Sequence, residues 1–136
     1  MPLHPSLEHY SLCKQNVKRN LSYTWNYLIT DHVKRGKSQD ALALYASMQK
    51  DHLIPSPHAF VALIKACRIL NDVEKGKELH ETVSSNGLLS MDPFIGSTLI
   101  DMYAKCGMLG KAHEVFDSLP FRTSVTWTVL IVGYSE

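Results

Sequence analysis

One short pattern occurs four times along this chain and predicts a helical unit that repeats about every 35 residues. Each copy begins with an aromatic residue or isoleucine and ends with Leu-Ile, within Trp25 to Ile29, Phe60 to Ile64, Ile95 to Ile100 and Trp127 to Ile131. The equivalent positions Asn26, Val61, Ser97 and Thr128 are separated by 35, 36 and 31 residues. Repeats of this length are typical of helix-pair arrays, in which each unit buries its apolar face only against its neighbours. We therefore predict an all-α solenoid whose function is binding, along one extended surface.

Proline, glycine and capping residues divide each unit into two helices. Proline is harmless in the first turn of a helix, glycine is favoured just past its end, and Ser, Asn and Asp are favoured at its N-cap. Ser38 is the candidate N-cap for the second helix of the first unit, and Asn71 or Asp72 for that of the second unit. The predicted helices span Trp25 to Val33 and residues 39–50, 57–70, 73–86, 93–105, 109–119 and 124–136.

The repeat divides the chain into units at residues 22–56, 57–92 and 93–123, with a partial unit at 124–136. Residues 1–21 form a tail, a degenerate upstream repeat or a targeting segment. Lys14, Lys18 and Arg19 against Glu8 partly resemble an organelle transit peptide, but the prolines at 2 and 5 do not. In the partial unit, Trp127, Leu130 and Ile131 lack a second helix of their own, so we expect them to be exposed.

Composition excludes several classes of protein. The formal net charge is +1, so charge alone does not indicate a nucleic-acid-binding protein. The three cysteines include no CxxC pair, and an odd number argues against a disulfide framework and favours a reducing compartment. We expect Cys67 and Cys106 to be small buried residues. No apolar stretch approaches the roughly 18 residues needed to cross a bilayer.

The residues within the units resemble one family. The run Leu99 to Gly107, followed by Ala112, Val115 to Asp117 and Pro120, resembles the short repeat of plant pentatricopeptide repeat proteins of the PLS subclass. Leu63 to Cys67 and Gly76 to His80 are similar to the long variant, and the Trp25-Asn26 and Trp127-Thr128 units to the ordinary type. This resemblance implies a right-handed α-solenoid of about three and a half repeats. It also implies that the first helices line a groove for single-stranded RNA, at one base per repeat.

The resemblance also implies which residues read RNA. The residue after the repeat's first aromatic and the last residue of the repeat choose the base together, which gives Asn26 with Ser56, Val61 with Asp92, Ser97 with Thr123, and Thr128 alone. A side chain three positions earlier lies between successive bases, at Tyr23, His58, Phe94 and Val125. Inter-repeat packing is the alternative for that row.

Side-chain chemistry adds a base preference. The Asn26 amide offers a donor and an acceptor and reaches the smaller pyrimidine edge, whereas the short hydroxyls of Ser97 and Thr128 leave room for a purine. Val61 cannot hydrogen-bond a base. Lys34 and Lys105 each lie eight residues past a reading position, and we expect them to contact phosphates together with Arg68. The alternative is that they stabilise helix C-termini.

Catalytic motifs are missing from the sequence. His80-Glu81 is not followed by a second histidine at the spacing of a zinc protease, and the His-x-Glu with Cys-x-x-Cys of zinc deaminases does not occur. We therefore predict no catalytic residues, metal, cofactor, small-molecule substrate or deaminase domain.

The predicted function is non-catalytic recognition of RNA during processing or C-to-U editing in a mitochondrion or chloroplast, with the mitochondrion favoured. Another pentatricopeptide repeat protein or an editing factor is a possible protein partner. The alternative function is a scaffold that stacks on another helical-repeat protein.

Overall fold

The computed structural model describes the backbone of residues 7–135 and the side chains of residues 21–135. Within this part of the chain it contains eight helices and no strand, which confirms the predicted all-α solenoid. The helices are α1 (Leu7–Lys34), α2 (Ser38–Lys50), α3 (Pro57–Leu70), α4 (Val73–Ser85), α5 (Leu88–Met91), α6 (Pro93–Lys105), α7 (Leu109–Ser118) and α8 (Ser124–Ser135).

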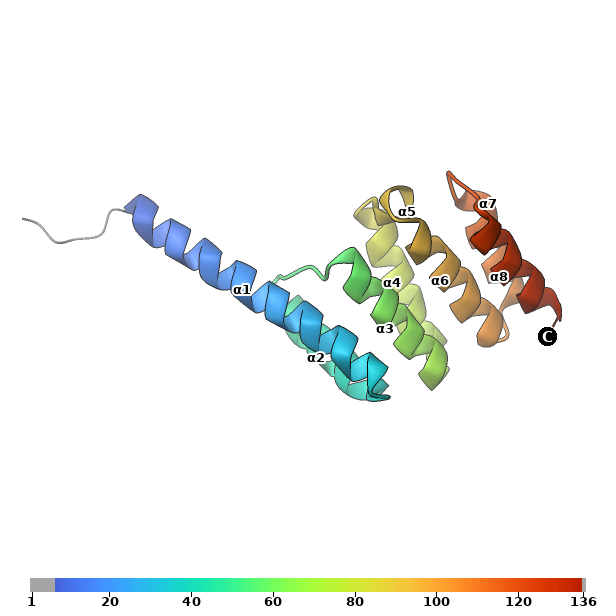
Figure 1. Ribbon diagram of the computed structural model, residues 1–136, viewed down its shortest axis with the longest axis horizontal. Helices are drawn as coiled ribbons and strands as arrows, with labels where there is room; N and C mark the ends of the chain where they lie inside the picture. Colours follow the sequence, from blue (N-terminus) through green and yellow to red (C-terminus); the bar gives the residue numbers. More distant parts are fainter. Residues whose placement is uncertain (1–6, 136) are drawn as a thin grey trace, which may run out of the picture.

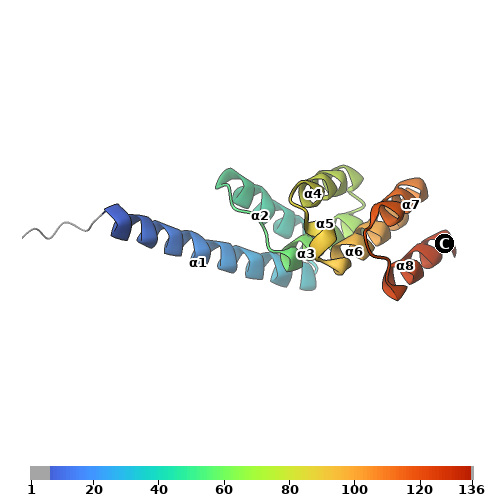
Figure 2. The ribbon, with the colours of Figure 1, turned by 90° about the horizontal axis from the view of Figure 1, so that it is seen from above.

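The helices form two layers (Figures 1 and 2). The first helices of the units, α1, α3, α6 and α8, lie side by side in one layer, and each packs against the next. The second helices, α2, α4 and α7, form the outer layer, and each packs against its own first helix and the first helix of the following unit. The layer of first helices is therefore continuous along the molecule.

Large apolar side chains fill the space between the layers. Tyr45 of α2 packs edge-on against Phe60 of α3, with ring centroids 6.3 Å apart, and Phe60 is fully buried. Leu63 and Leu99, from the two Leu-Ile pairs of α3 and α6, are also fully buried. Burying a side chain of this size contributes about 1.5–3 kcal/mol to stability. The residues that mark the repeat in the sequence therefore also form the hydrophobic core.

The starts of α3, α4 and α6 follow the local signals, and the start of α2 does not. Pro57 and Pro93 begin α3 and α6, and Asp72 caps α4 by accepting a hydrogen bond from the backbone N–H of Lys75 at 3.1 Å. The prediction for Ser38 was wrong. Lys37 occupies the N-cap of α2 without a side-chain bond, and the Ser38 hydroxyl is buried inside the first turn with no hydrogen-bond partner. Only residues 35–37 separate α1 from α2. The last of them, Lys37, therefore takes the N-cap position, and Ser38 is already the first residue of the helix.

Two helical segments differ from the expected bounds. α1 extends back to Leu7, so residues 7–21 continue the helix of the first unit, because no proline or glycine occurs between residues 6 and 35. Residues 1–6 lie outside the described part of the chain, as do the side chains of residues 7–20, and the targeting segment stays a prediction. The short helix α5 was not expected, and it fills the longest unit between Gly87, whose φ is 70°, and Asp92.

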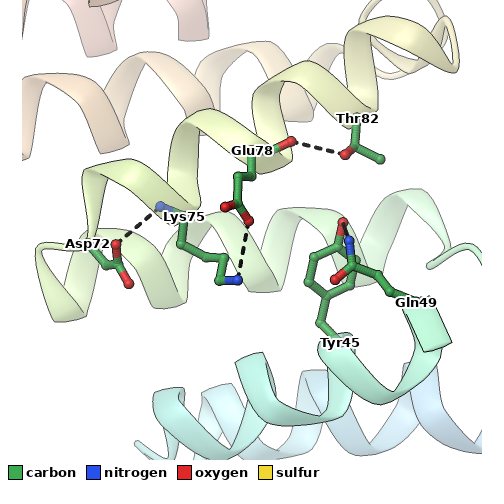
Figure 3. A network of polar contacts seen from close by, with 6 residues as sticks. All are labelled: Tyr45, Gln49, Asp72, Lys75, Glu78 and Thr82. Carbon is green, nitrogen blue, oxygen red and sulfur yellow. Dashed lines mark hydrogen bonds and ion pairs between the residues drawn. The ribbon is translucent and has the colours of Figure 1, made fainter.

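Several polar contacts on the outer layer lie within one helix. Figure 3 shows Gln49 donating to the Tyr45 hydroxyl within α2, and Lys75 pairing with Glu78 at 3.2 Å within α4. Lys77 and Lys111 each pair with a glutamate three residues away on their own helix, at 3.5 and 3.3 Å. The lysines of α4 and α7 are thus balanced by acids beside them.

Helix α8 is apolar on most of its surface. Trp127, Ile131 and Val132 are about half exposed, at 50%, 60% and 45%. Leu130 is 6% exposed, contrary to expectation, because α8 packs against both α6 and α7. In the described part of the chain, no helix combines the length and apolar character needed to cross a membrane.

Candidate functional site

The candidate site is the exposed face of the first-helix layer, which we call the groove face. In the first unit this face contains a hollow of about 510 Å³ between α1 and the N-terminus of α3. The hollow is lined by Tyr23, Asn26, Tyr27, Thr30, Asp31, Lys34, Ser56 and His58. Four of them were predicted to contact a base and one to contact a phosphate, so in the first unit the predicted residues of both kinds surround one space.

The structure brings the first predicted reading pair into contact. The side-chain oxygen of Asn26 accepts a hydrogen bond from the backbone N–H of Ser56 at 3.1 Å, across 30 residues of sequence. This bond fixes the amide at the mouth of the hollow, and it occupies one lone pair of the amide oxygen. The amide nitrogen supplies two donors for a ligand.

The last residue of each unit caps the first helix of the next. The side chain of Ser56 accepts from the N–H of Ala59 at 3.2 Å, that of Asp92 from Phe94 at 2.8 Å, and that of Thr123 from Thr126 at 3.3 Å. The three residues predicted to help choose a base therefore also satisfy backbone N–H groups that the helix leaves unpaired.

The other reading positions differ in exposure. Val61 is half-buried, and Ser97 is 6% exposed with its hydroxyl donating to the backbone oxygen of Phe94 at 3.1 Å. Thr128 is exposed and donates to the backbone oxygen of Ser124 at 2.7 Å. The hydroxyls of Ser97 and Thr128 donate back to their own helices, which leaves their oxygens available only as acceptors.

All four side chains of the predicted stacking row are exposed. Tyr23 is 76% exposed, Phe94 64% and Val125 50%, and His58 is also exposed at the N-terminus of α3. Aromatic side chains of this size are usually buried, so two on one surface are informative. Their exposure leaves these side chains accessible to a ligand, and both stacking on bases and inter-repeat packing stay predictions for this row.

The three predicted phosphate contacts have different surroundings. Lys34 lines the hollow, and Lys105 lies at the equivalent place at the end of α6, where it is exposed. The guanidinium of Arg68 instead contacts the Asp101 carboxylate of α6 at 2.7 Å, and both side chains are half-buried. In this conformation Arg68 joins two units of the solenoid.

Some groove residues were not predicted. Tyr27, at 62% exposure, and Asp31 line the hollow, and Asp31 pairs with Arg35 at 3.1 Å. Lys65 is exposed on α3. A signal for Tyr27 was available, because Tyr23 and Tyr27 are four residues apart and share one face of α1.

Burial shifts the pKa of several titratable groups in the described region. Burial raises the pKa of the Cys67 thiol to about 12, and Cys67 is fully buried, as predicted, whereas Cys106 is only half-buried. His80 of α4 contacts the Tyr103 hydroxyl of α6 at 2.8 Å, and burial lowers the pKa of His80. Among the residues that the structure describes, no three His, Cys, Asp or Glu side chains group as metal ligands would.

Two family models match the chain. A model described as the PPR repeat family matches residues 21–68, and a model described as the PPR repeat matches residues 97–121. Together they span just over half of the chain.

Among proteins of Arabidopsis thaliana, a mitochondrial pentatricopeptide repeat-containing protein is 40% identical over 124 residues, which are 91% of this chain and 19% of the relative. A chloroplastic one is 36% identical over 118 residues, 86% of this chain and 22% of the relative. The chain thus spans about a fifth of the length of these relatives.

A solved structure has a similar fold. The pentatricopeptide repeat protein PPR10, in complex with an 18-nucleotide psaJ RNA element, superposes with a TM-score of 0.68 at 19% sequence identity. The match covers 95% of this chain and 20% of PPR10. At this identity the similarity concerns the fold, and it agrees with the two-layer arrangement of helix pairs.

Proposed function

Because the chain belongs to the pentatricopeptide repeat family, we propose that its groove face binds single-stranded RNA and has no catalytic activity of its own. The observation that carries this proposal is the hollow of the first unit. There the Asn26 amide, the exposed ring of Tyr23 and the Lys34 ammonium surround one space of about 510 Å³. Hydrogen-bond donors, an aromatic surface and a cation are three kinds of contact that proteins make to single-stranded nucleic acids.

We further propose a location and a role for the protein. The relatives whose names give a mitochondrion or a chloroplast support an organellar location, and we favour the mitochondrion. We place the protein in RNA processing or C-to-U editing as a recognition or accessory factor of the PLS subclass. These three and a half repeats address three or four bases, and we propose another pentatricopeptide repeat protein or an editing factor as a protein partner.

The test is fluorescence anisotropy of the purified chain with labelled single-stranded RNA pools, each randomised at one position, over a range of salt concentrations. We expect binding that weakens with salt, and a pyrimidine preference at the base that contacts the first unit. Asn26→Ser shortens the side chain and should move that preference toward purines, while the preference at the Ser97 unit stays the same. A folded chain that binds no RNA at low salt would refute the proposal.

A second candidate function is supported by α8. We propose that its half-exposed side chains, Trp127, Ile131 and Val132, allow the chain to stack on another helical-repeat protein. Apolar stacking depends little on salt, whereas binding to phosphates weakens steeply as salt rises. Self-association or partner binding that Ile131→Glu abolishes, with RNA binding unchanged, would support this surface as a separate site.

A further inference from the structure

We infer that Lys65, on α3, is the side chain that contacts the RNA phosphate backbone in the second unit, in place of Arg68. This inference rests on the proposed function and adds one binding residue to it. It follows from the places of equivalent residues on the first helices, from the ion pair of Arg68 and from the distribution of charge between the two layers.

The second unit lacks a cation where the first and third units have one. Eight residues past the reading positions stand Lys34, Ile69 and Lys105. Ile69 is 56% exposed, so the unit presents an apolar side chain to solvent at this place. A phosphate bound beside Ile69 would therefore have no positively charged side chain at this position.

Lys65 lies one helical turn before Ile69 on the same face of α3. Residues four apart on a helix are neighbours, and about 6 Å of axial rise separates them. Lys65 is exposed, and it stands four residues past the reading position Val61. The residue at that offset in the first unit is Thr30, which lines the hollow, so the position faces the groove. A flexible lysine side chain spans the distance to a phosphate near Ile69.

Arg68 is held elsewhere. Its guanidinium contacts the Asp101 carboxylate at 2.7 Å, and the exposed fractions of the two side chains are 35% and 28%. Contacting a phosphate would require Arg68 to leave a half-buried carboxylate without a partner on the groove face, where that carboxylate would repel RNA. The pair contributes no net charge to the groove.

Lys65 also differs from the lysines of the outer layer. Lys75, Lys77 and Lys111 each pair with a glutamate on their own helix. In the described part of the chain, neither Lys34 nor Lys65 forms an ion pair with an acid. These two lysines therefore give the groove face of the first two units a positive charge that α4 and α7 do not present.

The experiment measures the slope of log affinity against log salt concentration for single-stranded RNA. Each phosphate contact on a single strand contributes about 0.7 to this slope, so Lys65→Ala should lower its magnitude by about 0.7. Its loss of affinity should then be about 2.5-fold larger at 50 mM than at 200 mM salt. The matched control is Lys50→Ala, which removes an exposed lysine from the end of α2 in the outer layer and should leave the slope unchanged.

Two double variants complete the test. In Lys65→Ala with Ile69→Lys, the cation moves to the place it has in the other units, and the slope should return to the wild-type value. In Arg68→Gln with Asp101→Asn, the ion pair becomes a neutral pair, and the slope should not change. Thermal unfolding of every variant separates a loss of binding from a loss of fold, because a lysine that only stabilised the C-terminal half of α3 would change the melting temperature and not the slope.

The outcomes are distinct. A wild-type protein that binds RNA, with a slope that Lys65→Ala leaves unchanged, would overturn this inference alone. A slope lowered in the Arg68 and Asp101 double variant, and not in Lys65→Ala, would assign the contact to Arg68 and also overturn it. Absence of binding by the wild-type protein at low salt would overturn the proposed function and the inference with it.

Discussion

Replacing Gly96 by alanine should destabilise the solenoid, although alanine is the better helix former. Gly96 lies in α6, directly before Ser97. A Cβ atom built there would be 2.6 Å from Leu119 Cδ2, 3.0 Å from Cδ1 and 3.4 Å from Cγ. Leu119 is buried, at 7% exposure, so its side chain would have to shift within the core to admit this atom. The steric cost of such overpacking is about 1–3 kcal/mol, against a gain of about 1 kcal/mol from helix propensity. We expect a net loss of about 1 kcal/mol in the free energy of unfolding.

The matched control is Gly110→Ala in α7, where a Cβ atom would meet nothing within 4 Å. Only the propensity term remains there, so this variant should gain about 0.5–1 kcal/mol. Urea denaturation followed by circular dichroism measures both changes. With a slope of about 2 kcal/mol per molar urea, the two midpoints should move in opposite directions by about 0.5 M or less.

A double variant tests the cause of the effect. Leu119→Ala removes the atoms that a Cβ at position 96 would meet, so in that background Gly96→Ala should become stabilising. Residues in contact show such coupling, whereas independent sites do not. If Gly96→Ala stabilises the wild-type protein, or destabilises both backgrounds equally, the close approach of Leu119 does not govern the stability of α6.

Three further predictions concern titration, stacking and reactivity. Because burial lowers the pKa of His80 in the folded state, its contribution to stability is fully present above the ordinary value of 6.5, and it is lost as the pH falls from 6.5 through the lowered folded-state pKa. The melting temperature of the wild type should therefore fall more between about pH 8 and pH 5 than that of His80→Gln. Phe94→Ala should weaken RNA binding by about 5- to 150-fold in anisotropy, and Phe94→Tyr should retain it; equal affinities for all three proteins would exclude stacking. Iodoacetamide should leave Cys67 unmodified in the native protein, because Cys67 is fully buried and its pKa is about 12. In denaturant, mass spectrometry should show Cys67 modified. Modification of the native protein at the denatured rate would contradict the burial.

The fold was predictable where the signals are local. Proline at the start of α3 and α6, Asp72 before α4 and the repeated Leu-Ile pairs each act within a few residues, and the structure agrees with them. The expectation for Ser38 failed because a serine two residues past a helix-ending glycine fits either the cap or the first turn. Helix α5 is a single turn, and Leu88 to Met91 carry no cap or period that separates them from a loop.

For the candidate site, the sequence predicts which positions are equivalent along the repeat, but it does not predict the contacts between side chains of different units. Equivalent positions along the repeat gave five of the eight residues around the hollow, because a solenoid places equivalent residues on one face, but they did not give Tyr27, Thr30 or Asp31. The pair of Arg68 and Asp101 joins residues 33 apart on two helices, and the bond from Ser56 to Asn26 spans 30 residues. Such contacts depend on how neighbouring units pack, so sequence spacing within one unit does not contain them.

The caps at the ends of the units restrict how a chain of this kind can change its target. Ser56, Asp92 and Thr123 each hold the start of the next helix through a short side-chain oxygen. Few residue types do this well, namely Ser, Thr, Asp and Asn, and losing a cap costs about 1 kcal/mol. Substitutions within this set keep the helix start and alter only the polar group beside the base, whereas others weaken the joint between units. If these positions read bases, only about four residue types are available to them, because the same residue must also cap the next helix whether or not RNA is bound.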